Sequence, residues 1–452
     1  MIRNIHTIVG AGPVGLLLGC LLAKRGIPSQ ILEKSERRSP LTRALMIHAA
    51  SLDIFSTIDV DRDVMARGLR QRYIHFDVDH EARFSLDFAC LSPAGFPGFV
   101  NLRQPVLERV LEERFTSLGG QVLRRYELID LAQHANDITL TVETPNGRRV
   151  ACVPFLVGCD GANSTVRGLL RTEFAGHDYT YRYLLAEGTP SQCSLSTDAS
   201  YMAINAQSAL SIVPMDNGEY RIAGPGSGTD VPDAPLTSES IEQLIRDTGL
   251  AGIPALLSYS AIRHYAVRER CAERFASGRV FLCGDSAHVH SPAGGQAMNL
   301  GFGDAFSLAW RLAGNAGIEA TGERWQAERM RLARAVIART QIGPLLAKMR
   351  GRTVSDTELT SLAETYSQLF HDVCEQDDPL RQKTLRPGVR LPNLPLSDGR
   401  SVWRALEGQS KIELSASTPA GHALASHFAC QAVDVHFRPD FHVEHVEASV
   451  RV

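Results

Sequence analysis

The part of this chain with the clearest chemical meaning is a glycine-rich segment near its N-terminus. It lies between a predicted strand, residues 5–9, and a predicted helix, residues 14–25. In such a turn the first glycine allows the sharp bend, the second lets the backbone approach a pyrophosphate, and the third lets the helix pack closely on the strand. The helix N-terminus then offers free N–H groups to the phosphates. The segment therefore predicts a dinucleotide site, formed by Gly10, Gly12, Pro13, Val14 and Gly15.

An acidic residue stands where the same site would need one. Glu33 ends the second predicted strand, which begins at Gln30. A carboxylate in this place is suited to accept hydrogen bonds from an adenosine ribose. We include Glu33 and the adjoining Lys34 among the expected cofactor-binding residues. The motif by itself does not separate FAD from NAD.

Two later segments favour FAD. Asp160-Gly161 follows a short apolar strand, residues 155–157, and Gly284-Asp285 follows another, residues 280–282. Three such sites along one domain are what an extended FAD molecule requires. The sequence therefore predicts that Asp160, Gly161, Gly284 and Asp285 bind the cofactor.

A third glycine-rich loop precedes a long predicted helix that starts near Gln296. Its glycines allow the backbone to lie against a flat ring. The N–H groups of the first helical turn can stabilise negative charge that develops at N1 and O2 of a reduced flavin. The loop residues expected to contact the flavin are Pro292, Gly294, Gly295, Ala297, Met298 and Asn299.

The segments over residues 278–288 and 292–299 resemble the class A flavoprotein aromatic hydroxylases, the group of the p-hydroxybenzoate and phenol hydroxylases. The resemblance covers residues 1 to about 350. It implies that Asp285 binds the ribityl chain, and that Asp160-Gly161 faces the pyrophosphate and a transient nicotinamide cofactor. It further implies that Arg43 and Gln104 reach the cofactor from flanking loops, with Arg103 and Arg167 as lesser candidates. The chain departs from the family pattern at Ala297, where glycine is common, and at Gly303, where a polar residue is common.

The resemblance implies an FAD-dependent monooxygenase that consumes NADH or NADPH and dioxygen. No second dinucleotide motif is evident in the sequence, which favours a reductant that docks transiently. In this family a C4a-hydroperoxyflavin transfers oxygen to a phenolic or polycyclic aromatic ring. Three alternatives remain open: a Baeyer–Villiger or epoxidising enzyme of the same fold, an antibiotic-modifying one, and a flavin-binding protein without catalysis.

The order of predicted elements indicates an α/β protein with a Rossmann-type FAD-binding domain. That domain is expected to be discontinuous, over residues 1–175 and 271–350, with an antiparallel substrate-binding sheet over residues 176–270. A helical connector is expected over residues 351–385. The C-terminal region, residues 386–452, resembles a shortened thioredoxin-like appendage of phenol-hydroxylase relatives; its one cysteine, Cys430, excludes thioredoxin redox chemistry.

Substrate-pocket residues are harder to predict. Leu210, Ile212 and Pro214 share one face of a predicted strand. If that face looks toward the flavin, the pocket is apolar and has no carboxylate-binding arginine there, which favours a phenol or a larger polycyclic aromatic. Met46 and His48 could reach the pocket from the other side. No catalytic acid or base can be named, and His288 and His290 are interpreted as structural more readily than catalytic.

Composition limits the remaining classes. The 452 residues carry a formal net charge of −3, which gives no electrostatic sign of nucleic-acid binding. The nine cysteines include no C-x-x-C pair, and no His, Cys or carboxylate group has metal-ligand spacing, so neither a disulfide framework nor a metal site is expected. The longest apolar stretch is too short to cross a bilayer. We expect a cytoplasmic enzyme that is a monomer or a homodimer.

Overall fold

The computed structural model describes most of the chain up to residue 340 and separate pieces beyond it. The described residues are 2, 4–78, 82–88, 98–190, 193–205, 209–225, 237–247, 256–314, 317–340, 396, 402–406, 409, 411–414, 420, 424, 433–437 and 443–448. The predicted connector over residues 351–385, the start of the C-terminal region at Arg386 and Cys430 lie outside this part.

A six-stranded sheet forms the centre of the N-terminal half, in the order β18-β19-β12-β1-β2-β8. Five neighbouring strands run parallel, and β18 is antiparallel to β19 at one edge. The strands are β1 (His6–Val9), β2 (Ser29–Glu33), β8 (Gln121–Arg124), β12 (Leu156–Gly158), β18 (Ala276–Ser277) and β19 (Val280–Leu282). The predicted parallel strands before Asp160 and before Gly284 are thus confirmed as neighbours, because β12 pairs with β19.

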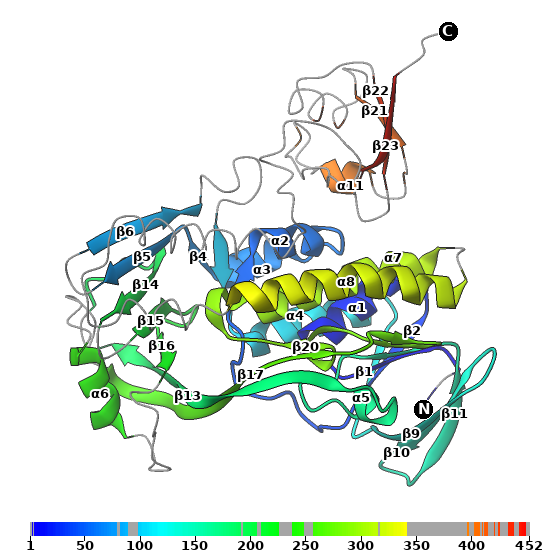
Figure 1. Ribbon diagram of the computed structural model, residues 1–452, viewed down its shortest axis with the longest axis horizontal. Helices are drawn as coiled ribbons and strands as arrows, with labels where there is room; N and C mark the ends of the chain where they lie inside the picture. The colour runs from blue at the N-terminus through cyan, green and yellow to red at the C-terminus, as the bar shows by residue number, and fades with distance from the viewer. Residues whose placement is uncertain are drawn as a thin grey trace.

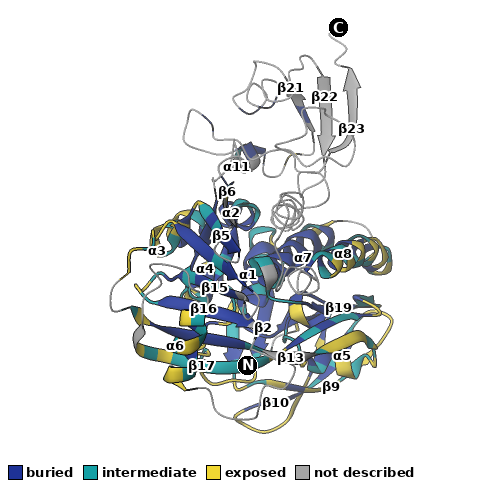
Figure 2. Cartoon of the chain, turned by 60° about the vertical axis from the view of Figure 1, so that its left-hand side comes forward, coloured by how far each residue is buried: buried dark blue, intermediate teal, exposed yellow. Residues whose placement is uncertain are grey.

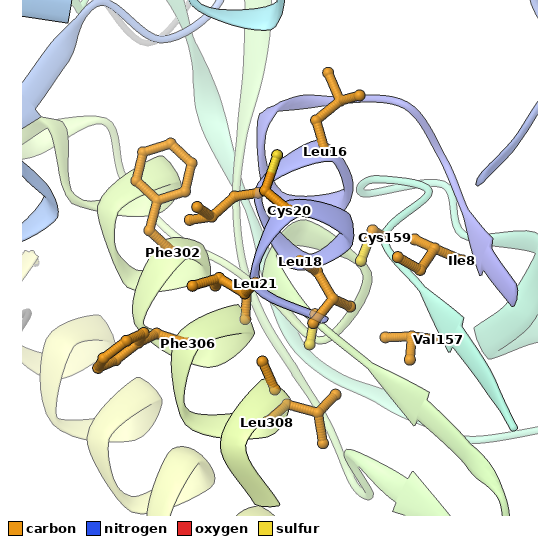
Figure 3. Close-up of a cluster of buried hydrophobic side chains, with 14 of the residues drawn as sticks. Ile8, Leu16, Leu18, Cys20, Leu21, Val157, Cys159, Phe302, Phe306 and Leu308 are labelled. Carbon is orange, nitrogen blue, oxygen red and sulfur yellow. The ribbon is translucent and has the colours of Figure 1, made fainter. Parts of the chain in front are cut away.

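Helices cover this sheet, as Figure 1 shows. They are α1 (Pro13–Lys24), α4 (Gln104–Ser117), α7 (Gln296–Ala313) and α8 (Ile318–Thr340). The helix α1 is apolar on nearly all sides because it lies between the sheet and its two neighbours α4 and α7. Figure 3 shows these contacts, with Leu21 of α1 beside Phe302 and Phe306 of α7, and Leu18 of α1 directed toward Val157 of β12. The N-terminal glycine segment therefore begins a helix that is buried over most of its length.

An eight-stranded sheet forms the second half, in the order β20-β17-β13-β16-β15-β14-β5-β6. Its strands are β5 (Tyr73–Val78), β6 (Ala82–Asp87), β13 (Phe174–Pro190), β14 (Ala199–Ile204), β15 (Ala209–Pro214), β16 (Tyr220–Pro225), β17 (Leu256–Ala272) and β20 (His288–Val289). The helix α6 (Ser238–Asp247) packs on it through Ile241 and Ile245. The sheet is antiparallel except where β14 meets β5. It differs from the sequence expectation because β5, β6 and β20 come from the ranges assigned to the FAD-binding domain.

The two long strands β13 and β17 connect the halves of the molecule (Figure 1). Two small sheets complete the described fold before residue 340, β11-β10-β9 and β3-β7-β4. Their strands are β3 (Met46–His48), β4 (Leu69–Gln71), β7 (Phe99–Asn101), β9 (Glu127–Gln133), β10 (Ile138–Glu143) and β11 (Arg149–Val153). The short helices are α2 (Ala49–Ser56), α3 (Asp61–Arg67), α5 (Thr165–Leu169), η2 (Gly284–Ser286) and η3 (Ala293–Gly295). Figure 2 shows that the central strands are buried, while α5, α6 and α8 carry exposed outer faces.

The described C-terminal elements are α11 (Val402–Leu406) and an antiparallel sheet of β21 (Lys411–Leu414), β22 (Val433–Phe437) and β23 (Val443–Ala448). The α/β fold with one mainly parallel and one mainly antiparallel sheet is confirmed. Three antiparallel strands and a short helix do not by themselves establish a thioredoxin-like appendage. No described helix has both the length and the apolar character needed to cross a membrane.

Candidate cofactor and substrate site

The first glycine turn is fixed by backbone geometry. Gly10 has φ +104°, and a Cβ there would lie 2.4 Å from the carbonyl oxygen of Cys159 on the neighbouring strand. A Cβ on Gly15 would lie 2.1 Å from the carbonyl oxygen of Gly10. Both positions therefore require glycine because of contacts within the protein.

Gly12 differs, because a Cβ there would meet no protein atom within 4 Å. It is the N-cap of α1, its φ of −76° is open to any residue, and Pro13 occupies the first helical position. Its backbone thus lies beside space at a helix N-terminus with the positive end of the helix dipole. This is the arrangement that a pyrophosphate needs, so the residues fit the expected cofactor.

Glu33 supports the same turn from the next strand. Its Oε2 accepts a hydrogen bond from the N–H of Ala11 at 2.9 Å, and its Oε1 accepts one from the N–H of Ser35 at 2.8 Å. Each carboxylate oxygen keeps a further lone pair. Glu33 can thus hold the turn and still accept hydrogen bonds from a ribose, while Lys34 is exposed beside it.

In the second segment the side chain of Asp160 and the backbone of Gly161 have different surroundings. The carboxylate of Asp160 accepts hydrogen bonds from the hydroxyl of Ser164 and from the N–H groups of Thr165 and Val166, at 2.6–3.1 Å, and so caps α5. Gly161 has φ +81°, and a Cβ there would meet no atom within 4 Å. The backbone of Gly161 is therefore free to approach a ligand, whereas the Asp160 side chain holds the loop.

Arg167 joins this segment to the next one. Its guanidinium donates to the carbonyls of Ser286 at 2.8 Å and Ala162 at 2.7 Å, and lies 3.8 Å from the ring centre of Phe174. These contacts fix the loop after Asp160 against the turn that carries Asp285. Arg167 acts here as a connection between the two segments.

Asp285 lies in the short helix η2, directly after β19. Its side chain is exposed to solvent, and it makes no hydrogen bond to any described residue. The protein that surrounds it nevertheless raises the pKa of its carboxyl, against the opposing charges of His288 and Arg43. A carboxyl that is exposed to solvent but has protein close around it can meet a bound ligand. The position suits an acceptor for a ribityl hydroxyl.

A buried network of charged side chains next to Asp285 was not predicted from the sequence. Asp304 of α7 accepts hydrogen bonds from the N–H of Gly284 at 3.1 Å, from His288 Nε2 at 2.7 Å and from Arg329 Nε at 2.8 Å. Burial alone would raise the pKa of Asp304, but the charges of His288 and Arg329 hold it below its ordinary value. The network fixes the turn that presents Asp285. The only sequence signal would have been an aspartate inside an apolar helix.

The third glycine loop is held in place by Asn299. Gly294 and Gly295 have φ +69° and +63°, so this backbone path is suited to glycine. The Nδ2 of Asn299 donates to the carbonyls of Gly295 at 2.7 Å and Met46 at 3.0 Å. Its Oδ1 accepts from the N–H of His48 at 2.9 Å and from the hydroxyl of Ser51 at 2.8 Å. All four hydrogen-bonding positions of this buried amide are used.

His48 completes the support of the loop. Its Nε2 lies 3.0 Å from the carbonyl oxygen of Gly294, which can only accept, so Nε2 carries the proton. Burial lowers the pKa of His48 to about 3, and the imidazole is neutral at ordinary pH. A Cβ on Gly295 would lie 3.0 Å from the Cβ of Met46. Met46 and His48, predicted for the substrate pocket, are thus placed directly against the expected flavin loop.

Gln104 and Arg103 start α4 and hold nearby segments. Gln104 Oε1 accepts the N–H of Ala44 at 3.1 Å, and its Nε2 donates to Glu108 at 2.8 Å. Arg103 pairs with Asp216 at 3.1 Å, a residue in the turn between β15 and β16. Arg43 has an exposed side chain whose charge is felt at Asp285. Among these three residues, Arg43 is the one that can reach a cofactor beside Asp285.

The strand β15 turns a different face toward the cofactor side from the one assumed. Leu210 and Ile212 are fully buried in a core cluster with Ile241 and Ile245 of α6. Residues opposite one another in an antiparallel pair share a face, and Val213 lies opposite Arg221 of β16. Arg221 reaches the carbonyl of Thr42, so its face looks toward the loop before Arg43.

The packing of α6 therefore changes which face of β15 is available to a substrate, and how polar that face is. Leu210, Ile212 and Pro214 are on the face that α6 covers, and Pro214 is also buried. The opposite face carries a buried arginine, Arg221 of β16, so the expectation of a pocket without an arginine applied only to the face of Leu210, Ile212 and Pro214. Strand alternation gave two faces of similar apolar character, and the position of α6 distinguishes them. No group of His, Cys or acidic residues suited to a metal occurs among the residues that the structure describes.

The two sheets and the three glycine loops define a flavin-binding oxidoreductase fold. The model of a family described as "FAD binding domain" matches residues 5–340. The chain belongs to this family. The resemblance to the class A flavoprotein aromatic hydroxylases and the prediction of FAD as cofactor are thereby confirmed.

Individual relatives agree in length and in architecture. The rifampicin monooxygenase of Streptomyces venezuelae is 31% identical over 436 residues, which cover 90% of this chain and 86% of that protein. An uncharacterized aromatic compound monooxygenase of Bacillus subtilis is 29% identical over 89% of this chain and 82% of its own length. The solved structure of the anhydrotetracycline hydroxylase of Streptomyces rimosus has a TM-score of 0.76 and 26% identity, with coverage of 99% and 96%.

Proposed function

We propose that this protein is an FAD-dependent monooxygenase that consumes NAD(P)H and hydroxylates a ring carbon of a polycyclic aromatic or large phenolic substrate. Membership of the FAD-binding family supports the cofactor. The relatives named for rifampicin and anhydrotetracycline support a substrate of several fused rings. Bound FAD, once reduced, supplies the activation of dioxygen.

Three groups of residues have separate tasks in this proposal. The backbone at Gly12 and Gly161 admits the pyrophosphate at the N-terminus of α1. Asp285 accepts a ribityl hydroxyl. The first turn of α7, which includes Met298, presents N–H groups that have no acceptor within the helix and can stabilise negative charge on a reduced ring.

The observation that supports the proposal most is the position of Asp285. Three elements meet there, because a Cβ on Gly284 would lie 3.2 Å from the side chain of Val14 of α1, and the N–H of Gly284 is bonded to Asp304 of α7. The carboxylate is accessible and bonded to no described side chain. Asp285 is therefore close to both helices between which an extended FAD would lie.

The experiment has two stages. Purified protein is titrated with FAD, and the loaded enzyme is then assayed for NAD(P)H oxidation with a panel of phenols and fused-ring aromatics, with mass spectrometry of the products. We expect stimulation by a fused-ring compound and a product heavier by one oxygen atom on a ring carbon. Oxygen inserted into a C–C bond would support the Baeyer–Villiger alternative, and FAD binding without any turnover would support a non-catalytic protein.

Asp285→Ala tests the assigned site directly. We expect this variant to remain folded, because the side chain makes no hydrogen bond to described residues, and to lose FAD affinity by about tenfold or more, the equivalent of a lost charge-assisted hydrogen bond. The absorbance of bound flavin after gel filtration measures the loss. A variant that is purified with a full complement of FAD would remove Asp285 from the site.

An antibiotic-modifying monooxygenase is the second candidate, favoured by the 31% identity to a rifampicin monooxygenase. The substrate panel should therefore include rifamycins and tetracyclines. An antibiotic-modifying enzyme and a biosynthetic hydroxylase would differ in this assay only in the compound that each one turns over. The division at residues 175, 270 and 350, the thioredoxin-like C-terminal region, the cytoplasmic location and the monomeric or dimeric state stay predictions.

A further inference from the structure

We propose that Arg221, held by Glu187, is a positioning residue that sets the place of Arg43 beside Asp285 and so governs FAD affinity. This inference rests on FAD as the cofactor and not on the identity of the substrate. Both residues of the pair belong to the eight-stranded sheet, Glu187 to β13 and Arg221 to β16, where they lie directly opposite one another.

The guanidinium of Arg221 binds one carboxylate and two carbonyls. Its Nε donates to Glu187 Oε1 at 2.9 Å, and its Nη2 forms a second, shorter bond to the same oxygen. Its Nη2 also donates to the carbonyl of Thr42 at 2.7 Å, and its Nη1 donates to the carbonyl of Arg43 at 3.1 Å. Because the guanidinium is planar and rigid, these contacts fix the two carbonyls relative to the sheet.

Arg263 of β17 reinforces the contact at Thr42. Its Nη2 donates to the same carbonyl at 2.7 Å and lies 3.8 Å from Glu187 Oε1. Arg221 and Glu187 are each only 7% exposed. A buried ion pair gives little net stability compared with apolar side chains of similar size. We therefore infer that the pair has a role other than stability. This role is to fix the backbone of Thr42 and Arg43, whose carbonyls accept hydrogen bonds from Arg221.

The peptide unit between Arg43 and Ala44 is held from both sides. Arg221 donates to its carbonyl oxygen, and Gln104 of α4 accepts its N–H at 3.1 Å. One partner belongs to the eight-stranded sheet and the other to a helix that covers the six-stranded sheet. The orientation of this peptide, and hence the direction of the Arg43 side chain, depends on both halves of the molecule.

Arg43 carries the effect to the cofactor site. Its side chain is exposed, but its charge lies close enough to Asp285 to be felt there. A cation at this place can meet the phosphates or the ribityl chain that pass Asp285. Without Arg221 the carbonyls of Thr42 and Arg43 would lose their shared donor, and Arg43 would sample other positions.

The test is a double-mutant cycle on FAD affinity. Apoproteins of Arg221→Met, Arg43→Met and the combination are titrated with FAD and followed by flavin fluorescence. We expect each single variant to bind FAD about tenfold more weakly, and the combination to be no more than about threefold weaker than the worse single variant, because both changes remove the same contribution. A merely structural role of Arg221 would instead give losses that multiply.

Two further variants keep the result interpretable. Arg279→Met is the matched control, because Arg279 also donates to two carbonyls, of Ala135 at 3.0 Å and Pro154 at 3.3 Å, away from the cofactor loops; its FAD affinity should not change. Arg221→Met alone leaves Glu187 buried without its main partner and could unfold. Arg221→Met with Glu187→Gln removes both charges and should fold while still losing FAD affinity.

FAD affinity within about twofold of wild type in a folded Arg221 variant would overturn the inference, as would fully multiplicative losses in the cycle. Wild-type protein that takes up no FAD at all would instead refute the proposed function. The two failures are therefore distinguishable in the same set of titrations.

Discussion

The six-stranded sheet and the eight-stranded sheet contribute to the site by different means. At the edge of the first, backbone conformation defines the site, through glycines at residues 10, 12, 161 and 284. At the face of the second, a long side chain does so, because Arg221, held by Glu187, donates hydrogen bonds to a loop that lies far away in the sequence. A backbone conformation that requires glycine can be recognised from the local sequence. A contact between a side chain and a distant segment leaves no local sequence pattern.

The largest expected effect comes from the backbone side of this comparison. Gly10→Ala places a Cβ 2.4 Å from the carbonyl of Cys159 at a φ of +104°, and we expect a loss of stability of about 4 kcal/mol or more. Gly12→Ala meets no protein atom and should cost less than about 1 kcal/mol of stability, yet lower FAD affinity by about tenfold or more. Urea unfolding and FAD titration measure the two effects.

Gly26→Ala is the control for this pair, because Gly26 has φ +72° but no contact that a Cβ would disturb. It should cost about 1–2 kcal/mol from conformation alone and leave FAD affinity unchanged. Equal loss of FAD in Gly12→Ala and Gly26→Ala would show that Gly12 has no special relation to the cofactor.

In the eight-stranded sheet, the two faces of β15 should respond differently to substitution. Leu210→Ala removes a fully buried side chain from the core beneath α6 and should cost about 2–5 kcal/mol of stability. Val213→Ala, on the face shared with Arg221, should cost about 1 kcal/mol and raise the KM for the aromatic substrate. Thermal unfolding and steady-state kinetics separate the two; a raised KM in a stable Leu210→Ala protein would reverse the assignment of faces.

The smallest effect concerns pH and the loop that His48 supports. Burial lowers the pKa of His48 from 6.5 to about 3, so the unfolded chain binds a proton between these values while the folded protein does not. The free energy of unfolding should therefore fall as the pH drops below 6.5, by at most about 1.4 kcal/mol per pH unit from this residue. His48→Gln keeps a donor for Gly294 and should make the apoprotein less sensitive between pH 6.5 and 4.

His290 is the natural comparison for that measurement, since burial lowers its pKa to about 4 and it titrates over much of the same range. Its contribution remains in His48→Gln, so the pH dependence should be reduced and not abolished. An unchanged slope in His48→Gln would mean that the imidazole is accessible to protons in the folded protein.

The sequence by itself determined the cofactor half of this protein. A turn that needs φ near +104°, or a backbone that a phosphate must approach, admits only glycine, and the residue type therefore records the geometry. The place of Asp285 after a short apolar strand and a glycine is also local, and its role at the ribityl chain was implied by the resemblance to the aromatic hydroxylases. The parallel strands and the long helix after residue 296 followed from apolar runs.

Tertiary structure alone decided how these pieces are supported. Asp304 binds Arg329 from another helix, and Asn299 binds the backbone of Met46, which is 253 residues away. The choice between the two faces of β15 depended on where α6 packs, and the role of Arg221 depended on a loop from the other half of the chain. Such contacts depend on how folded helices and strands are placed relative to one another. The residue types and spacing within a single helix or strand do not encode that placement.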